Sequence, residues 1–176
     1  GDYGLPSPGF ELVPIRRTMT NAVDFAFIGD SIGTGMALGS SSEFQVLTDE
    51  VFDAEMYSAV SGRTTAQGVA IADTVPIGTD LVVVELGYND TPSAMPDRID
   101  AMMTALAARE VGLVVWPNLS TRRSGYDYAA VNAALDDARS DWPNLVVADW
   151  NARVAYRRGD ARTAEENLQH LNRRNH

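Results

Sequence analysis

The sequence predicts an α/β domain in which helices cover both faces of a parallel β-sheet. Two features of the 176-residue chain point to this class. Short, nearly continuous apolar runs alternate with longer segments whose apolar residues recur at helical spacing, a pattern typical of parallel strands buried on both faces. Hydrophobic residues make up 45% and charged residues 22% of the chain, as in ordinary globular proteins, and this length supports one hydrophobic core.

The first elements follow a lead-in of unusual composition. Residues 1–22 contain three prolines and three glycines without a clear period, which predicts an extended segment that precedes the domain. Residues 23–28 are predicted to form the first strand, because aromatic and aliphatic residues alternate there up to Gly29. A helix with a serine-rich middle is expected over 36–51, and a second strand over 54–60.

The middle of the chain gives the strongest patterns. A short helix is predicted over 64–72. Residues 80–86 form the most apolar run of the chain, with an acid at each edge, and predict a third strand buried on both faces. A helix is predicted over 96–110, since four of its apolar residues recur at helical spacing: Ile99, Met102, Met103 and Leu106.

The last elements complete the sheet. Residues 113–116 predict a strand that Pro117 ends, and 145–148 predict a fifth strand. Between them, a helix is expected over 128–140. Its apolar face consists of Val131, Ala134, Leu135 and Ala138. The sequence shows no repeat and no internal linker, so we expect a single domain over 23–176.

The charge of the chain excludes some classes of partner. The net charge is −10, and all 14 basic residues are arginines. Residues 1–150 carry 21 acids and 8 arginines, whereas residues 151–176 carry 3 acids and 6 arginines. Nucleic acid is not expected as a partner, because phosphate binding requires a basic surface. No apolar run approaches the roughly 20 residues of a membrane span, so we expect no transmembrane segment in this chain.

Three polar clusters follow predicted strands. They are Gly29-Asp30-Ser31, Ser61-Gly62-Arg63-Thr64 and Gly87-Tyr88-Asn89-Asp90. The carboxyl ends of parallel strands lie along one edge of the sheet, where ligands bind, so we expect the clusters to converge. The amides of Ser31 and Gly62 and the side chain of Asn89 would then form an oxyanion hole, which suits acyl transfer.

A serine nucleophile requires a base. The chain has two histidines, and His176 is its last residue, so His170 is the candidate that removes the proton from Ser31. Each residue also has a structural interpretation: Ser31 as a helix N-cap, Gly62 and Asn89 as turn residues, and His170 as a surface residue. Asp30 is expected to be a hydrogen-bonding group of its turn. With one credible imidazole and no cysteine, neither a metal site nor a cofactor is expected.

These motifs resemble those of the SGNH (GDSL-type) hydrolases, over nearly all of the chain from Val23 onward. Gly29-Asp30-Ser31 resembles the serine block of that family, Gly62 its glycine block, Gly87-Tyr88-Asn89-Asp90 its Gly-x-Asn-Asp block and His170-Leu171 its histidine block. Asp149-Trp150-Asn151 is similar to a segment of the SGNH domains appended to membrane acyltransferases. The resemblance implies a three-layer flavodoxin-like sandwich with five parallel strands.

By this resemblance Ser31 is the nucleophile, His170 is the base, and Ser31, Gly62 and Asn89 supply the oxyanion hole. The sequence departs from the family at Asn167, which stands three residues before the histidine, where the family usually has an aspartate. Three possibilities follow: a Ser31–His170 pair without an acid, a site that no longer turns over usefully, or a substitute acid. The candidate acids are Asp160, Glu165 and Glu166.

The function expected from these residues is hydrolysis of a carboxylic ester through an acyl-serine intermediate, without a cofactor. The family analogy favours a small acyl group, such as acetyl on a carbohydrate, and an extracytoplasmic or secreted location. Two alternatives remain open. One is an O-acyltransferase that uses the same site, and the other is a catalytically weakened SGNH-like binding module.

Overall fold

A computed structural model of the chain describes residues 23–38 and 52–157. Their strands are β1 (Val23–Gly29), β2 (Phe52–Ala59), β3 (Leu81–Glu85), β4 (Leu113–Pro117) and β5 (Leu145–Ala148). Their helices are α1 (Ser31–Leu38), α3 (Thr65–Ala72), α4 (Met95–Ala108), α5 (Tyr128–Ala138) and α6 (Trp150–Arg157), with a 3-10 turn η1 (Pro92–Ala94) before α4.

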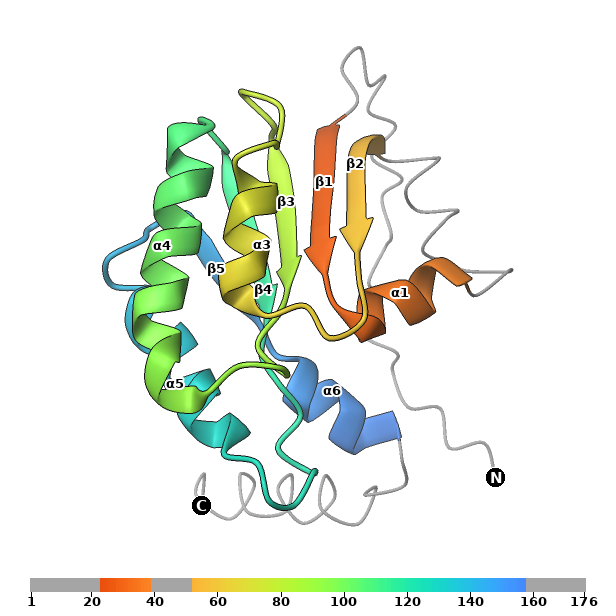
Figure 1. The fold of residues 1–176 in the computed structure, drawn as a ribbon, viewed down its shortest axis with the longest axis vertical. Coiled ribbons are helices and arrows are strands. Elements are labelled where there is room, and N and C mark those ends of the chain that lie inside the picture. Colours follow the sequence, from red (N-terminus) through yellow and green to blue (C-terminus); the bar gives the residue numbers. More distant parts are fainter. Residues whose placement is uncertain (1–22, 39–51, 158–176) are drawn as a thin grey trace, which may run out of the picture.

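The five strands form one parallel sheet in the order β2-β1-β3-β4-β5 (Figure 1). The chain moves from β1 outward to β2 and then returns past β1 to β3. The connections on the two sides of β1 therefore run in opposite directions, and right-handed crossovers place their helices on opposite faces of the sheet. The direction changes between β1 and β3, and ligands bind at this position in open α/β sheets, outside the carboxyl ends of the strands.

In the described part of the chain, the two faces of the sheet differ in how completely they are covered. The helices α3, α4 and α5 cover one face (Figure 1). The strand residues on that face are fully buried: Ile28, Val82, Val84 and Val114. On the opposite face, Phe27, Val83 and Val115 form a row across β1, β3 and β4. Side chains from α1 and α6 border an apolar pocket of about 170 Å³ above this row. This pocket lies beside the carboxyl ends of β1 and β3.

Local sequence explains where α3 begins and how closely it packs. Thr64 caps the helix: its side chain accepts the Gln67 amide while the Gln67 side chain accepts the Thr64 amide, a capping box. One turn later, Gly68 lets the helix approach the sheet, because a Cβ there would lie 2.4 Å from Cδ1 of Leu86. The segment before α3, which includes Gly62, is held at the end of β1 because the Val60 amide and the Arg63 side chain both donate to the Gly29 carbonyl.

The predicted fold class is confirmed. All five predicted strands are present with boundaries within two residues of the prediction, as are the helices predicted over 64–72, 96–110 and 128–140. The helix predicted over 36–51 begins earlier, at Ser31, because Asp30 caps it, and its part beyond residue 38 lies outside the described residues. The helix α6 was not predicted. The predicted lead-in over 1–22 also lies outside the described residues.

None of the helices in the described segments is long and apolar enough to cross a membrane.

The capping box gives a test of the fold. Thr64→Ala removes the side chain that accepts the Gln67 amide, and we expect it to lower the free energy of unfolding by about 1 kcal/mol. The matched control is Thr91→Ala, since Thr91 stands at the N-cap of η1 without a side-chain cap bond. We expect less than about 0.5 kcal/mol there. Urea denaturation measures both, and equal losses would contradict the role of the capping box.

Candidate active site

The turn after β1 presents Ser31. The strand ends at Gly29, Asp30 follows as a fully buried residue, and Ser31 is the exposed first residue of α1. One carboxylate oxygen of Asp30 accepts the Ile32 amide at 3.0 Å. Asp30 therefore caps α1, so the cap is supplied by the residue before Ser31 and the Ser31 side chain is not needed for it. The predicted role of Asp30 as a hydrogen-bonding group of the turn is confirmed.

A second buried carboxyl group lies against the same turn. Glu85, the last residue of β3, accepts the amides of Asp30 and Gly33 with one side-chain oxygen, each at 3.1 Å. Its main-chain carbonyl also accepts the Asp30 amide at 3.2 Å. A residue of the neighbouring strand thus binds the amide of Asp30, directly before Ser31, and the amide of Gly33, two residues after it.

The amide of Ser31 differs from those of its neighbours. From Asp30 to Thr34, four of the five main-chain amides donate to Asp30 or Glu85. In the described part of the chain, neither the amide nor the hydroxyl of Ser31 has a hydrogen-bond partner. Both groups stand at the N-terminus of a helix, where amides and the helix dipole favour an anion.

Arg63 joins the ends of β1 and β2. Its guanidinium is buried and donates to the Gly29 carbonyl at 3.2 Å and to the Ser58 carbonyl at 2.6 Å. Burial lowers the pKa of Arg63 from its ordinary value. Directly before it, Gly62 has φ +80°, a left-handed conformation that glycine adopts without strain. Gly62 is exposed, and its amide has no acceptor among the described residues.

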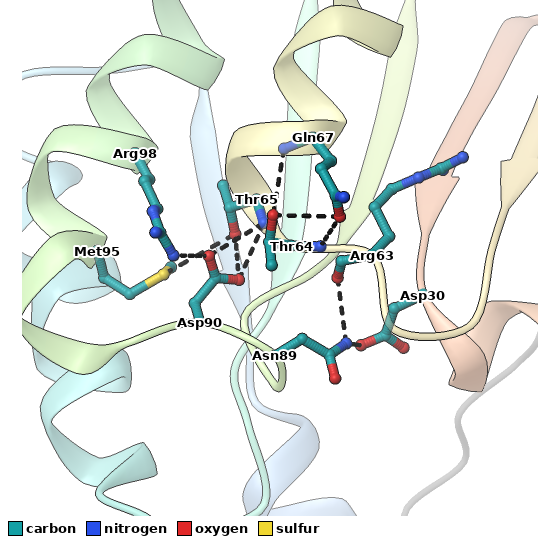
Figure 2. A network of polar contacts seen from close by, with 9 residues as sticks. All are labelled: Asp30, Arg63, Thr64, Thr65, Gln67, Asn89, Asp90, Met95 and Arg98. Atoms are coloured by element: carbon teal, nitrogen blue, oxygen red, sulfur yellow. Dashed lines mark hydrogen bonds and ion pairs between the residues drawn. The ribbon is translucent and has the colours of Figure 1, made fainter.

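The third strand end contributes two side chains that point in different directions (Figure 2). Asn89 turns toward the first two strand ends, where its amide donates to Asp30 at 2.9 Å and to the Arg63 carbonyl at 3.1 Å. Asp90 turns toward the helices, where it accepts the Thr65 amide and hydroxyl and pairs with Arg98. Asn89 therefore links the strand ends, and Asp90 anchors their loop to α3 and α4.

The residue before Asn89 borders the pocket. The Tyr88 hydroxyl accepts the Ser120 amide at 2.7 Å. Burial is the main cause that raises the pKa of Tyr88. Tyr88, Trp150 and Glu85 all line the apolar pocket, together with Ile32 of α1. Among the described residues that line this pocket, Glu85 has the one carboxyl side chain.

The environment of Glu85 favours its neutral form. Burial, the charge of Asp30 and a hydrogen bond with the Asp30 side chain raise the pKa of Glu85 from 4.5 to about 8, although its two main-chain hydrogen bonds act in the opposite direction. Asp30 accepts hydrogen bonds on both carboxylate oxygens, from Ile32 and Asn89. We therefore assign the negative charge of this pair to Asp30 and the proton to Glu85 at neutral pH.

The predicted convergence of the three strand ends is present. Ser31 follows Asp30, Gly62 precedes Arg63, and Asn89 contacts both Asp30 and Arg63. The two remaining predicted residues, His170 and Asn167, lie outside the described residues. The alternative acids also lie outside them, namely Asp160, Glu165 and Glu166. In the two described segments, no group of three or more acids and histidines is placed to hold a metal ion.

Sequence reasoning missed Glu85. The signal was a single acid inside an otherwise apolar run, between Val84 and Leu86, at the end of the strand that precedes Asn89. An acid flanked by apolar residues on a buried strand must find hydrogen-bond donors, and the nearest are the amides of the neighbouring strand end. The structural role of Arg63 was missed for a similar reason, because an arginine in a polar cluster is usually exposed.

No protein-family model matches this sequence, and no curated protein is similar enough to count as a relative. The structure is similar to the C-terminal catalytic domain of peptidoglycan O-acetyltransferase A (OatA) from Streptococcus pneumoniae, which was solved with a methylsulfonyl adduct. The TM-score is 0.57, with 20% sequence identity over 79% of this chain and 75% of that one. At this identity the similarity is one of fold, and at that level it confirms the predicted resemblance.

The raised pKa of Glu85 predicts a pH-dependent stability. The folded state keeps the Glu85 proton up to about pH 8, whereas the unfolded chain releases it near 4.5. Between these values the folded state binds more protons, so this group's contribution to the free energy of unfolding falls as pH rises. Below pH 4.5 the contribution is complete, and it is lost as pH rises through 8.

Glu85→Gln keeps an uncharged side chain of the same shape and removes this dependence. We expect the variant to gain stability relative to the parent between pH 5.5 and pH 9, measured by urea denaturation. Glu110→Gln, at an exposed position, is the control for removing one acid. A constant difference between the parent and Glu85→Gln over this range would contradict the assignment of the proton to Glu85.

Proposed function

We propose that this domain is a serine esterase that hydrolyses a carboxylic ester through an acyl-Ser31 intermediate. One observation carries the proposal. Asp30 and Glu85 bind the amides around Ser31 and cap α1, and the amide and hydroxyl of Ser31 itself are left exposed at the β1/β3 switch point. A serine used only as a helix cap would have its hydroxyl engaged with the helix amides.

In the proposed reaction, the Ser31 hydroxyl oxygen attacks the ester carbonyl carbon, and His170 accepts the hydroxyl proton. The resulting oxyanion receives hydrogen bonds from the amides of Ser31 and Gly62. When the tetrahedral intermediate collapses, the carbon–oxygen bond to the alcohol breaks and His170 returns the proton to the leaving alkoxide. Water then attacks the acyl-Ser31 ester with the same assistance, which releases the acid and restores the serine.

Asn89 would be the third donor of the oxyanion hole. Its side-chain amide has two hydrogens, and both already have acceptors, Asp30 at 2.9 Å and the Arg63 carbonyl at 3.1 Å. To stabilise an oxyanion, Asn89 has to exchange one of these bonds for the oxyanion. We assign the exchange to the bond with the Arg63 carbonyl, because the bond to the charged Asp30 is the stronger one.

A second candidate is O-acyl transfer, in which a hydroxyl of an acceptor replaces water in the second step. The similarity in fold to a peptidoglycan O-acetyltransferase domain supports this alternative and an acetyl group on a carbohydrate as the substrate class. Asn167 in place of an aspartate supports a third reading, a module that binds but turns over weakly.

The nucleophile is tested first by a serine-directed fluorophosphonate probe. We expect the parent protein to be labelled and to hydrolyse short-chain aryl esters, and Ser31→Ala to lose both properties while it stays folded. The matched control is Ser61→Ala, an exposed serine at the same edge of the sheet, which should be labelled like the parent. Absence of labelling in the parent would favour the binding module, and labelling of folded Ser31→Ala would exclude Ser31 as the nucleophile.

The third oxyanion donor is tested by Asn89→Ala. If Asn89 stabilises the oxyanion, kcat falls by about 10²–10³-fold and KM changes little, because the bond forms only in the transition state. The assay is run well below the melting temperature of the variant, since Asn89 also links Asp30 and Arg63. An unchanged kcat with a raised KM would identify Asn89 as a residue that binds the ground state.

A further inference from the structure

Glu85 lies where an apolar side chain is expected. Its neighbours on the same face of the sheet are Val83 and Phe27, and it lines the apolar pocket between α1 and α6. Placing a carboxyl group there costs free energy unless hydrogen bonds compensate it. The compensating donors are two main-chain amides, those of Asp30 and Gly33, which bracket Ser31 in the chain.

The turn that contains Ser31 packs closely against the Glu85 side chain. A Cβ at Gly29 would lie 2.4 Å from Cε1 of Phe27 and 3.0 Å from Oε2 of Glu85, and a Cβ at Gly33 would lie 2.5 Å from the same Phe27 atom. Gly29 and Gly33 therefore let the main chain on both sides of Ser31 approach the floor formed by Phe27 and Glu85. The hydrogen bonds from these two amides to Glu85, together with this close approach, fix the height and orientation of the turn over the sheet.

The Gly33 amide reports on Glu85 most directly. The Asp30 amide has a second acceptor, the main-chain carbonyl of Glu85, so it stays bound when the side chain is removed. Among the described residues, the Gly33 amide has a single acceptor, the Glu85 side chain. Without it, the remaining hydrogen bonds of the first turn of α1 are those with Asp30 and the one that the Tyr57 hydroxyl donates to the Gly33 carbonyl.

We propose that Glu85 is a positioning residue for the nucleophile, which holds Ser31 by accepting the amides of Asp30 and Gly33. The Ser31 amide, which has no acceptor among the described residues, stays available for the oxyanion. This inference rests on the proposed role of Ser31. Small displacements of a reacting group cost up to about 100-fold in rate, so a turn held on both sides has a direct effect on kcat. The same constraint is not required for substrate affinity.

Three variants separate positioning from packing. Glu85→Gln keeps an acceptor oxygen for both amides, and we expect its kcat for aryl esters to stay within about threefold of the parent. Glu85→Met has a similar length but no such acceptor, and we expect a loss in kcat of at least about tenfold with KM within about twofold. Val83→Ala, on the same face of β3, removes packing in the same pocket and should leave kcat within about twofold.

Amide hydrogen exchange provides a readout that does not depend on activity. We expect the Gly33 amide to be protected in the parent and in Glu85→Gln, and to exchange at least about tenfold faster in Glu85→Met, relative to an amide of α4 in the same sample. If Glu85→Met does not fold, protection of Gly33 in the parent and in Glu85→Gln still tests the geometry.

The two proposals fail in different ways. If the parent is not labelled by the probe, the proposed function is wrong, whereas the exchange rates still decide whether Glu85 holds the turn. Positioning by Glu85 is overturned if Gly33 exchanges freely in the parent. It is also overturned if Glu85→Met keeps the parent kcat, if Glu85→Gln loses as much as Glu85→Met, or if Val83→Ala loses as much.

Discussion

Two buried carboxyl groups, those of Asp30 and Glu85, fix the turn between β1 and α1 against the end of β3. They stand at the ends of adjacent strands, β1 and β3, and between them they accept the amides of Asp30, Ile32 and Gly33. Burial and the charge of Asp30 raise the pKa of Glu85 to about 8, so Glu85 keeps its proton at neutral pH. The helix α1 begins where it does because of this pair, and Ser31 is exposed because its neighbours are bound.

The loop after β3 extends this arrangement to the rest of the domain. Asn89 and Asp90 are adjacent in sequence but act on opposite sides: Asn89 on the strand ends, Asp90 on the helices that cover the sheet. The Asp90 side chain is fully buried and paired with Arg98, so it gains charge-assisted hydrogen bonds in a medium of low polarity. The loop of Asn89 and Asp90 therefore connects the site with the helical layer.

Most of the fold could be predicted because its signals are local. The apolar run around Val83 and the helical spacing of Met102 and Leu106 each define an element without knowledge of the others. Two boundaries could not be predicted. The start of α1 depends on Asp30, a residue of the turn whose capping role is defined by the fold. The helix α6 begins at Trp150, and its first turn is held by Asp149 and by Asn118 from the loop after β4.

By itself, the sequence determined the order of strands and helices, the parallel sheet and the three polar clusters at its edge, including Ser31, Gly62 and Asn89. These follow from periodicity and from the residue types that end strands. Only the tertiary structure decided which polar groups have partners. Glu85 and Arg63 connect the strand ends, and the Ser31 amide has no acceptor among the described residues, because hydrogen bonds between strand ends join residues 26 to 59 positions apart. No local pattern records such pairings, since they depend on which strands the fold places side by side.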